Sequence, residues 1–283
     1  MSNRRPILPE TVRFYRAEVQ RTIELSPGFC RVTVSSDDLS AFSYLGFDHW
    51  FRLFLPHPGQ TDWRLPTATS KLWYAQWLAT PSRQRPHCAN YTVADFRPAE
   101  RELDIDVVLH RRPSGELEGR VAQWAASAGP GDPVAFLDEG LLFNPPPDTS
   151  AVVLAGDESA LPALAGILRS LPPDTTGRAV LEVPGPADVR ELPHPAGVTL
   201  QWVVRAERDP AATPGAAALS AFTAAPQHTK LDPARTYAFL VGESRLATEG
   251  RRQLVRQGLP KDRITFCGFW KSPTTDRRRM PTH

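Results

Sequence analysis

The sequence predicts a two-domain protein in which an antiparallel six-stranded β-barrel, residues 1–146, precedes an α/β domain with a parallel sheet, residues 147–283. Three observations support this prediction. The length of 283 residues corresponds to about two domains of typical size. Short β-type runs dominate the first half, whereas strands and helices alternate in the second. The proline-rich stretch 143–148 lies between them and has the composition of a linker.

Six runs in the first half are rich in β-branched, aromatic or other apolar residues and are expected to be the strands of the barrel. They cover residues 12–25, 29–35, 49–55, 72–79, 102–110 and 133–137. The clearest is 102–110, in which apolar residues at alternate positions indicate a strand with one buried face. Several short strands at this spacing are typical of a small barrel or sandwich.

One helix is expected in the first half, over residues 121–128, directly after Gly119. The first N–H groups of a helix have no partner within the helix, so they can bind a phosphate. The alternative is a short helix that only plugs one end of the barrel.

Strands in the second half are expected at 151–155, 179–183, 198–204, 237–241 and 264–266, with helices after the first and fourth of them. This alternation predicts a mainly parallel sheet, whose ligands bind beyond the carboxyl ends of the strands.

Polar residues follow two of these strand ends. Asp157, Glu158 and Ser159 come after the first strand, and Gly242, Glu243 and Ser244 come after the fourth. They could face a ligand, or they could simply cap the helices that follow. Near the last strand end, the rings of Phe269 and Trp270 could stack on a planar cofactor or seal the interface between the two domains.

The charge balance excludes a general attraction to polyanions. Lys plus Arg is 33 and Asp plus Glu is 31, a formal net charge of +2, so we expect no nucleic-acid partner and no membrane partner. No apolar stretch approaches the roughly 20 residues that cross a bilayer. Any anionic ligand must therefore be met by a local cluster of cations.

Two classes of enzyme have no motif in this chain. The seven histidines show no HExxH spacing and there is no GxSxG, so neither a metallohydrolase nor a serine hydrolase is indicated. Cys30, Cys88 and Cys267 stand far apart and predict neither a zinc site nor a disulfide framework. We expect no bound metal and a cytoplasmic protein.

A series of segments carries a family resemblance across nearly the whole chain. They are LSPGFCRVTV (25–34), FDHWFRLFLP (47–56), NYTVADF (90–96), ELDIDVVLH (102–110), GRVAQW (119–124), PGDPV (130–134), LAGDESALPALAGIL (154–168), LQWVVR (200–205), VGE (241–243) and GFWK (268–271). In this order they resemble the siderophore-interacting protein family, FAD-dependent ferric-siderophore reductases of the ferredoxin-reductase-like superfamily.

The resemblance implies an FAD-binding barrel followed by an NAD(P)-binding domain, with NADH or NADPH as the electron source and a ferric chelate as substrate. It also implies roles for individual residues. Those implied to bind the flavin cofactor are Tyr91, Thr92, Val93, His110, Gly119, Arg120, Val121, Ala122 and Trp124. Those implied to approach the nicotinamide or the flavin ring are Asp157, Glu158, Ser159, Phe269 and Trp270, and Arg52 is implied to attract an anionic ferric siderophore.

The chain departs from the family at positions that bind anions. The family's flavin motif is R-x-Y-T-x-R, but Ala89 and Ala94 occupy the two arginine positions. Charge-assisted hydrogen bonds contribute about 1.5–3 kcal/mol each, so FAD binding should be weakened unless other groups, such as Arg120, compensate. Asp138 and Glu139 replace part of a G-P-R-G turn and should repel an anionic chelate.

Three functions agree with these observations. The first is flavin-dependent reduction of ferric chelates. The second is a natural-product biosynthetic enzyme that uses the pocket between the domains, with FAD altered in role or lost and a biosynthetic intermediate as substrate. The third is a ligand-binding protein without catalysis.

Overall fold

The structure, a computed structural model, describes residues 5–112, 114–209, 211–224 and 231–272. The chain divides between Leu141 and Leu142 into two units, each of which has its own sheet and core. Arg5 and Pro6 belong with the second unit, where the Arg5 carbonyl accepts a hydrogen bond of 3.0 Å from the Asn144 side chain.

The first unit is a seven-stranded antiparallel sheet with the order β4-β3-β7-β1-β2-β6-β5. Its strands are β1 (Phe14–Ser26), β2 (Phe29–Ser35), β3 (Trp50–Leu55), β4 (His87–Thr92), β5 (Asp95–Arg97), β6 (Glu102–Val108) and β7 (Pro133–Gly140). Its helices are the 3-10 turn η1 (Asp37–Ala41), α1 (Leu72–Ala79) and α2 (Arg120–Ser127).

The two strands at the ends of this order are consecutive in the chain, and this closes the barrel. Only Val93 and Ala94 separate β4 from β5. The Val93 N–H donates to the carbonyl of His49 at 2.7 Å, and the Ala94 N–H donates to the carbonyl of Asp104 at 2.9 Å. The sheet therefore curls until its first and last strands meet at these two residues.

The predicted fold class is confirmed, but the first sheet has seven strands rather than six. The predicted strand at 72–79 is wrong because these residues form helix α1, in which Trp73 and Trp77 stand one turn apart. The Trp73 ring meets Phe54 edge-on at 5.8 Å, and the Trp77 indole donates to the Pro86 carbonyl.

The strands β4 and β5 were not predicted, since neither shows alternating apolar residues.

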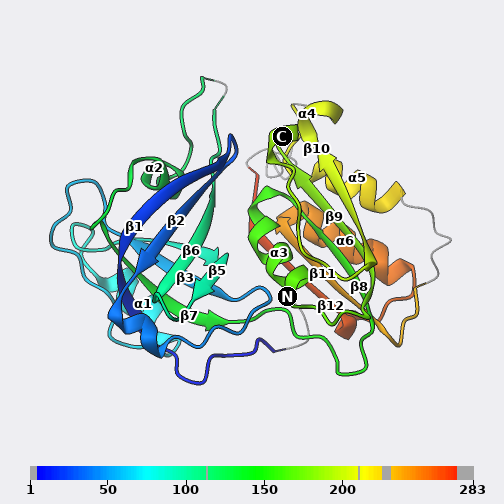
Figure 1. The fold of residues 1–283 in the computed structure, drawn as a ribbon, viewed down its shortest axis with the longest axis horizontal. Helices are drawn as coiled ribbons and strands as arrows, with labels where there is room; N and C mark the ends of the chain where they lie inside the picture. The colour runs from blue at the N-terminus through cyan, green and yellow to red at the C-terminus, as the bar shows by residue number, and fades with distance from the viewer. Residues whose placement is uncertain (1–4, 113, 210, 225–230, 273–283) are drawn as a thin grey trace, which may run out of the picture. The chain divides into compact units, whose positions relative to one another are not determined.

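The core of the first unit includes the inward side chains of the strands and one face of α2. Val19, Val32 and Ile105 are fully buried in it, and Val121 and Trp124 of α2 join the same cluster. Figure 1 shows α2 lying at one end of the curled sheet. The helix thus covers that end of the barrel with its apolar side chains.

The second unit is a five-stranded parallel sheet with the order β10-β9-β8-β11-β12. Its strands are β8 (Ala151–Gly156), β9 (Thr176–Val183), β10 (Gly197–Val204), β11 (Thr236–Glu243) and β12 (Ile264–Trp270). Its helices are α3 (Leu161–Ser170), α4 (Arg205–Arg208), α5 (Ala216–Ala224) and α6 (Ser244–Arg256), with 3-10 turns η2 (Glu158–Ala160), η3 (Pro186–Asp188) and η4 (Lys261–Arg263).

Helices cover both faces of this parallel sheet. Ala218 and Phe222 of α5 and Leu246 of α6 pack with Val153 and Leu240 in one cluster. Figure 1 shows α3 on the opposite face. The carboxyl ends of the strands remain at one edge of the sheet, where the polar residues of the first and fourth strands meet.

Within the described ranges, none of the helices has the length and apolar character needed to cross a membrane.

Candidate functional site

The start of α2 is a candidate binding feature of the first unit. Gly119 is its N-cap, with φ of +92°, and no side chain caps the helix. A Cβ added at Gly119 would meet nothing within 4 Å. The space beside Gly119 is therefore open, and an uncapped helix start of this kind has N–H groups suited to an anion.

Arg120 adds an unsatisfied donor at the same place. Its Nη2 donates to the Pro56 carbonyl at 2.7 Å, while its Nε is buried and has no hydrogen-bond partner. Desolvation lowers the pKa of this guanidinium from its ordinary value, which indicates a cation without a compensating carboxylate. A buried donor of this kind beside an uncapped helix start fits a phosphate-bearing cofactor such as FAD.

The side chains of the other α2 residues implied to hold FAD are buried, which leaves only their backbone to face a ligand. Val121, Ala122 and Trp124 are each at most 6% exposed and pack their side chains into the core. His110 follows the end of β6, and its carbonyl accepts from the Glu118 N–H at 2.8 Å. This bond holds together the two ends of the loop that leads to Gly119.

The flavin motif on β4 presents alternate residues to opposite sides. Ala89 and Tyr91 pack against the core cluster that contains the α2 residues. Tyr91 is half-buried, and desolvation raises the pKa of its phenol. Val93 is fully buried, so it takes part in any cofactor site through its backbone rather than its side chain.

Thr92 lies opposite an unpredicted candidate residue. It pairs across the sheet with Trp50, whose indole Nε1 is buried without a hydrogen-bond partner. Buried donors are rarely left unsatisfied in native proteins, so this one also fits a missing ligand or water. No motif singles out Trp50, because the burial of its indole N–H without a partner results from the pairing of the strands and not from the local sequence.

Arg52 is already neutralised by a neighbouring acid. Its Nε donates to Glu139 Oε1 at 2.9 Å and its Nη1 to the Asn90 side chain at 2.6 Å. The guanidinium also lies 4.8 Å from the ring centre of Trp50 and 5.4 Å from that of Trp73. The basic position implied to attract a substrate and the acidic position expected to repel it therefore form one ion pair.

The expectation that Asp138 repels an anion at the surface is wrong, because Asp138 is only 1% exposed. His49 Nδ1 accepts from the Leu45 N–H, so its Nε2 carries the proton and donates to Asp138 at 2.8 Å. The Gly140 N–H donates to the same carboxyl oxygen. Asp138 thus has a structural role in joining β7 to the segment before β3.

In the second unit, the Asp157 carboxylate joins three strand ends. Its Oδ1 accepts from the Ser159 N–H at 2.9 Å and from the Ser159 hydroxyl at 2.5 Å. Its Oδ2 accepts from the Glu243 N–H at 2.6 Å and from the Trp270 indole at 3.3 Å. Gly242, with φ of +117°, permits this approach, since a Cβ there would lie 2.7 Å from the carboxyl group.

Burial gives this carboxyl an unusual acidity. Desolvation, followed by the neighbouring charge of Glu158, raises the pKa of Asp157 to about 7, although the hydrogen bonds from Ser159 and Glu243 oppose the shift. The side chain caps η2, as the capping alternative predicts. At the other strand end the cap of α6 is Glu243 rather than Ser244, whose hydroxyl donates to the Trp270 carbonyl at 2.8 Å.

Glu158 belongs to a buried ionic network that the sequence did not predict. Arg205 Nη2 meets Glu158 Oε1 at 2.7 Å, and its Nη1 meets Glu182 Oε1 at 2.6 Å. Both glutamates are fully buried, and Glu182 also accepts from the backbone of Gly215 and Ala218. Glu158 therefore ties β8 to the ends of β9 and β10, and its carboxylate is fully occupied.

The structure thus brings Asp157, Ser159 and Trp270 together at the carboxyl edge of the parallel sheet. Phe269 is half-buried one residue before Trp270 in β12. A cavity of about 440 Å³, whose lining includes Glu243, lies along α5 and α6. Its polar lining includes Thr213, Ser220, Thr223, Glu243, Arg245, Glu249 and Arg256.

Among the described residues, no group of three His, Cys, Asp or Glu side chains could hold a metal ion. None of the three cysteines, all of which lie in the described residues, forms a disulfide, and burial raises the pKa of Cys88 to about 12.

Two family models cover most of the chain. The siderophore-interacting FAD-binding domain matches residues 18–141, and the siderophore-interacting protein model matches residues 149–273. The chain belongs to the siderophore-interacting protein family. It therefore carries an FAD-binding domain in its first unit, the unit that contains the uncapped start of α2.

Curated relatives and solved structures agree with this membership. An uncharacterized protein of Mycobacterium tuberculosis is 32% identical over 92% of this chain and 90% of its own length. The ferric vibriobactin reductase ViuB of Vibrio cholerae is 28% identical over 87% of this chain and 85% of its own. The NADPH-dependent ferric-chelate reductase of Escherichia coli is 26% identical over 95% and 98%.

Among solved structures, a siderophore utilization protein from T. fusca has a TM-score of 0.76 at 27% identity, covering 93% of this chain and 94% of its own. The siderophore-interacting protein SipS from Aeromonas hydrophila has a TM-score of 0.74 at 28% identity, covering 93% of both chains. A ferredoxin NADP+ reductase from Neisseria gonorrhoeae shares the fold, with a TM-score of 0.58 at 15% identity over 91% of this chain and 99% of its own.

Replacing Arg205 should destabilise the second unit strongly. In R205M the buried carboxylates of Glu158 and Glu182 lose their cation, so we expect the free energy of unfolding to fall by about 3–5 kcal/mol. Denaturant unfolding followed by tryptophan fluorescence measures the change. The matched control is R252M, which removes an exposed pair with Glu249 and should cost about 1 kcal/mol or less. Equal losses in the two variants would contradict a strong role for the network.

The acidity of Asp157 should appear in the pH dependence of stability. Because its pKa is raised in the folded state, the folded chain keeps a proton that the unfolded chain releases. This contribution to stability is complete below about pH 4 and is lost as the pH rises toward 7.

Unfolding titrations of wild type and D157N between pH 5 and 8 test this prediction. The wild type should lose stability over that interval relative to D157N, whose side chain cannot ionise. The exposed carboxylate variant D174N is the control and should keep the wild-type slope. A D157N curve parallel to that of the wild type would show that Asp157 is ionised throughout.

Proposed function

We propose that this chain is a flavin-dependent oxidoreductase that uses NADH or NADPH to reduce Fe(III) held by a siderophore or a similar chelate. The observation that carries the proposal is the open, cationic start of α2 within the FAD-binding domain, where Gly119 is uncapped and Arg120 Nε lacks a partner. The names of the relatives from Vibrio cholerae and Escherichia coli support a ferric chelate as substrate.

We assign the two cofactors to the two halves of the chain, FAD to residues 1–146 and NAD(P)H to residues 147–283. When bound, FAD supplies the chemistry that accepts a hydride and passes on single electrons. The backbone of α2 and the side chain of Arg120 would hold its diphosphate, and Tyr91 and Thr92 of β4 would adjoin the flavin. His110 would lie on the adenosine side.

In the second unit, Trp270, Phe269 and Ser159 would contact the nicotinamide portion. The hydroxyls and arginines that line the cavity between α5 and α6 suit the rest of a dinucleotide, since they offer donors to phosphate and ribose oxygens. Asp157 and Glu158 would act as positioning residues, because their carboxylates are engaged by backbone groups, Trp270 and Arg205.

Reduction would release the metal because hard oxygen ligands, such as those of siderophores, bind Fe(II) less tightly than Fe(III). The Arg52 and Glu139 pair would set the charge that an anionic chelate meets. The alternative of a biosynthetic enzyme has no support from the relatives described above.

The purified protein should be yellow, or should become so with added FAD, and NADH or NADPH should bleach it under anaerobic conditions. Absorbance in the flavin band, at about 450 nm, measures both steps. Addition of a ferric siderophore should then restore the colour. A protein that cannot be reconstituted with FAD, or one that neither nucleotide bleaches, would exclude the reductase function.

Freeing Arg52 should favour anionic substrates. In E139Q the guanidinium loses its carboxylate partner, and we expect the KM for an anionic ferric chelate to fall about two- to fivefold, as a partly exposed ion pair is worth up to about 1 kcal/mol. Steady-state kinetics at low ionic strength measures the effect. A neutral ferric chelate is the control and should show an unchanged KM; a fall for both substrates would argue against a charge effect.

A further inference from the structure

Two histidines lie beside Arg120 in the first unit. His87 is the first residue of β4 and pairs with Leu55 at the end of β3. His57 follows two residues later, and its ring centre lies 6.5 Å from that of His87. The Arg120 side chain lies at the same end of β3, because it donates a hydrogen bond to the carbonyl of Pro56, the residue between Leu55 and His57. The three side chains therefore gather where β3 ends and α2 begins.

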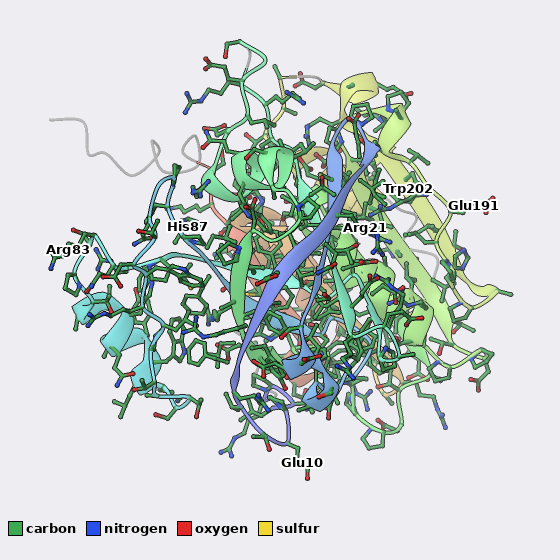
Figure 2. All side chains as sticks on the ribbon, turned by 60° about the vertical axis from the view of Figure 1, so that its left-hand side comes forward. Glu10, Arg21, Arg83, His87, Glu191 and Trp202 are labelled. Atoms are coloured by element: carbon green, nitrogen blue, oxygen red, sulfur yellow. The ribbon has the colours of Figure 1, made fainter. Side chains whose placement is uncertain are left out.

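This cluster adjoins the first of the two missing arginines. His87 stands two residues before Ala89 on β4, and residues at that spacing share one face of a strand. Ala89 packs against the core cluster that includes Val121 and Ala122 of α2. His87 is therefore on the α2 side of β4, on the face where an arginine at position 89 would stand. Figure 2 labels His87 at the start of this strand.

Two other arginines of the barrel, on β2 and β5, are paired with acids. Arg31 is paired with Asp106 and Asp104 on β6. Arg97, which follows the second missing position by three residues, is paired with Glu102 and Asp104. The positive charge of each is therefore already balanced by carboxylates, which weakens its attraction for an anionic ligand. By contrast, no acid among the described residues forms an ion pair with Arg120, whose Nη2 donates to the carbonyl of Pro56.

Among the described residues, the charges that act on His87 are those of His57 and Arg120, both of which are basic groups. On the segment before β4, Asp62 accepts a hydrogen bond from the Gln84 amide, and Arg85 lies over the Trp77 ring. The thiol of Cys88 has a pKa raised by burial to about 12 and stays neutral near pH 7.

We propose that His57, His87 and Arg120 form a substitute anion site that binds the diphosphate of FAD in place of the arginines absent at positions 89 and 94. The inference rests on the proposed function, since it takes FAD as the ligand. It assigns two histidines that the family motif does not include, and it accounts for a basic cluster that no acid in the described residues neutralises.

The site makes the binding of FAD depend on pH. Desolvation, His57 and Arg120 together lower the pKa of His87 below its ordinary value, so His87 is neutral near pH 7 in the free protein. A bound diphosphate favours the charged imidazolium, and binding therefore takes up a proton. The affinity for FAD should rise as the pH falls from 8 toward 6.

The experiment compares wild type, the double variant H57Q/H87Q and the single variant R120Q. Flavin fluorescence titration of the apoprotein gives the Kd for FAD between pH 6 and 8. We expect the wild-type Kd to fall with falling pH and the Kd of H57Q/H87Q to stay nearly constant. R120Q should weaken FAD binding about tenfold or more, the usual effect of losing one charge-assisted hydrogen bond.

Riboflavin is the matched ligand control, because it has the same ring system and no phosphate. Its Kd should be the same in wild type and in all these variants. H194Q, which changes an exposed histidine of the second unit, is the matched protein control and should behave as wild type. Restoring the family residue in the H57Q/H87Q/A89R triple variant should recover the FAD affinity without its pH dependence.

Each outcome bears on one of the two proposals. If FAD binds H57Q/H87Q with the wild-type Kd and the wild-type pH dependence, the substitute anion site is refuted and the flavin function stands. An equal loss of riboflavin and FAD affinity also refutes it, since the variants would then act through the fold. If the wild type binds neither flavin, the proposed function itself fails.

Discussion

The second unit depends on one carboxyl group that is shielded from water. Asp157 is 1% exposed and accepts hydrogen bonds from Ser159, from the backbone of Glu243 and from the Trp270 indole. These partners come from the ends of β8, β11 and β12, so one side chain sets the distance between three strand ends. Gly242 has to be a glycine because of it. Parallel sheets bind their ligands at the carboxyl ends of the strands, and here the spacing of those ends is fixed by one buried side chain.

The first unit is organised by the closure of its barrel. Val93 and Ala94 join the two edge strands, and the flavin motif runs directly into them along β4. A residue in this motif consequently serves the sheet as well as the cofactor. The replacement of arginine by alanine at positions 89 and 94 leaves the closure intact, because its hydrogen bonds come from the backbone.

Much of this fold could be predicted from the sequence. Parallel strands and helices in the second half were recognisable because buried parallel strands are continuous apolar runs, as in 151–155. The first half was harder. The run 72–79 reads as a strand from its aromatic content, but Trp73 and Trp77 face the protein body at helical spacing. The strand β4, with the sequence HCANYT, has too little apolar periodicity to be recognised.

The parts of the candidate site that could be predicted are those formed by residues close together in the sequence. The N-cap at Gly119 and the cap at Asp157 follow from residues a few positions apart. The pairing of Arg205 with Glu158 and Glu182 joins residues 47 and 23 positions apart, so it depends on the order of the strands. The cluster at Arg120 likewise requires β3, β4 and α2 to meet, which no short motif records.

The side chain of Val93 is fully buried in the core, and its N–H donates to the carbonyl of His49. The hydrogen bonds that close the barrel are therefore made within the chain. A substitution in β4 that changes an outward contact thus leaves these closing bonds in place, so effects on ligand affinity and on stability are separable.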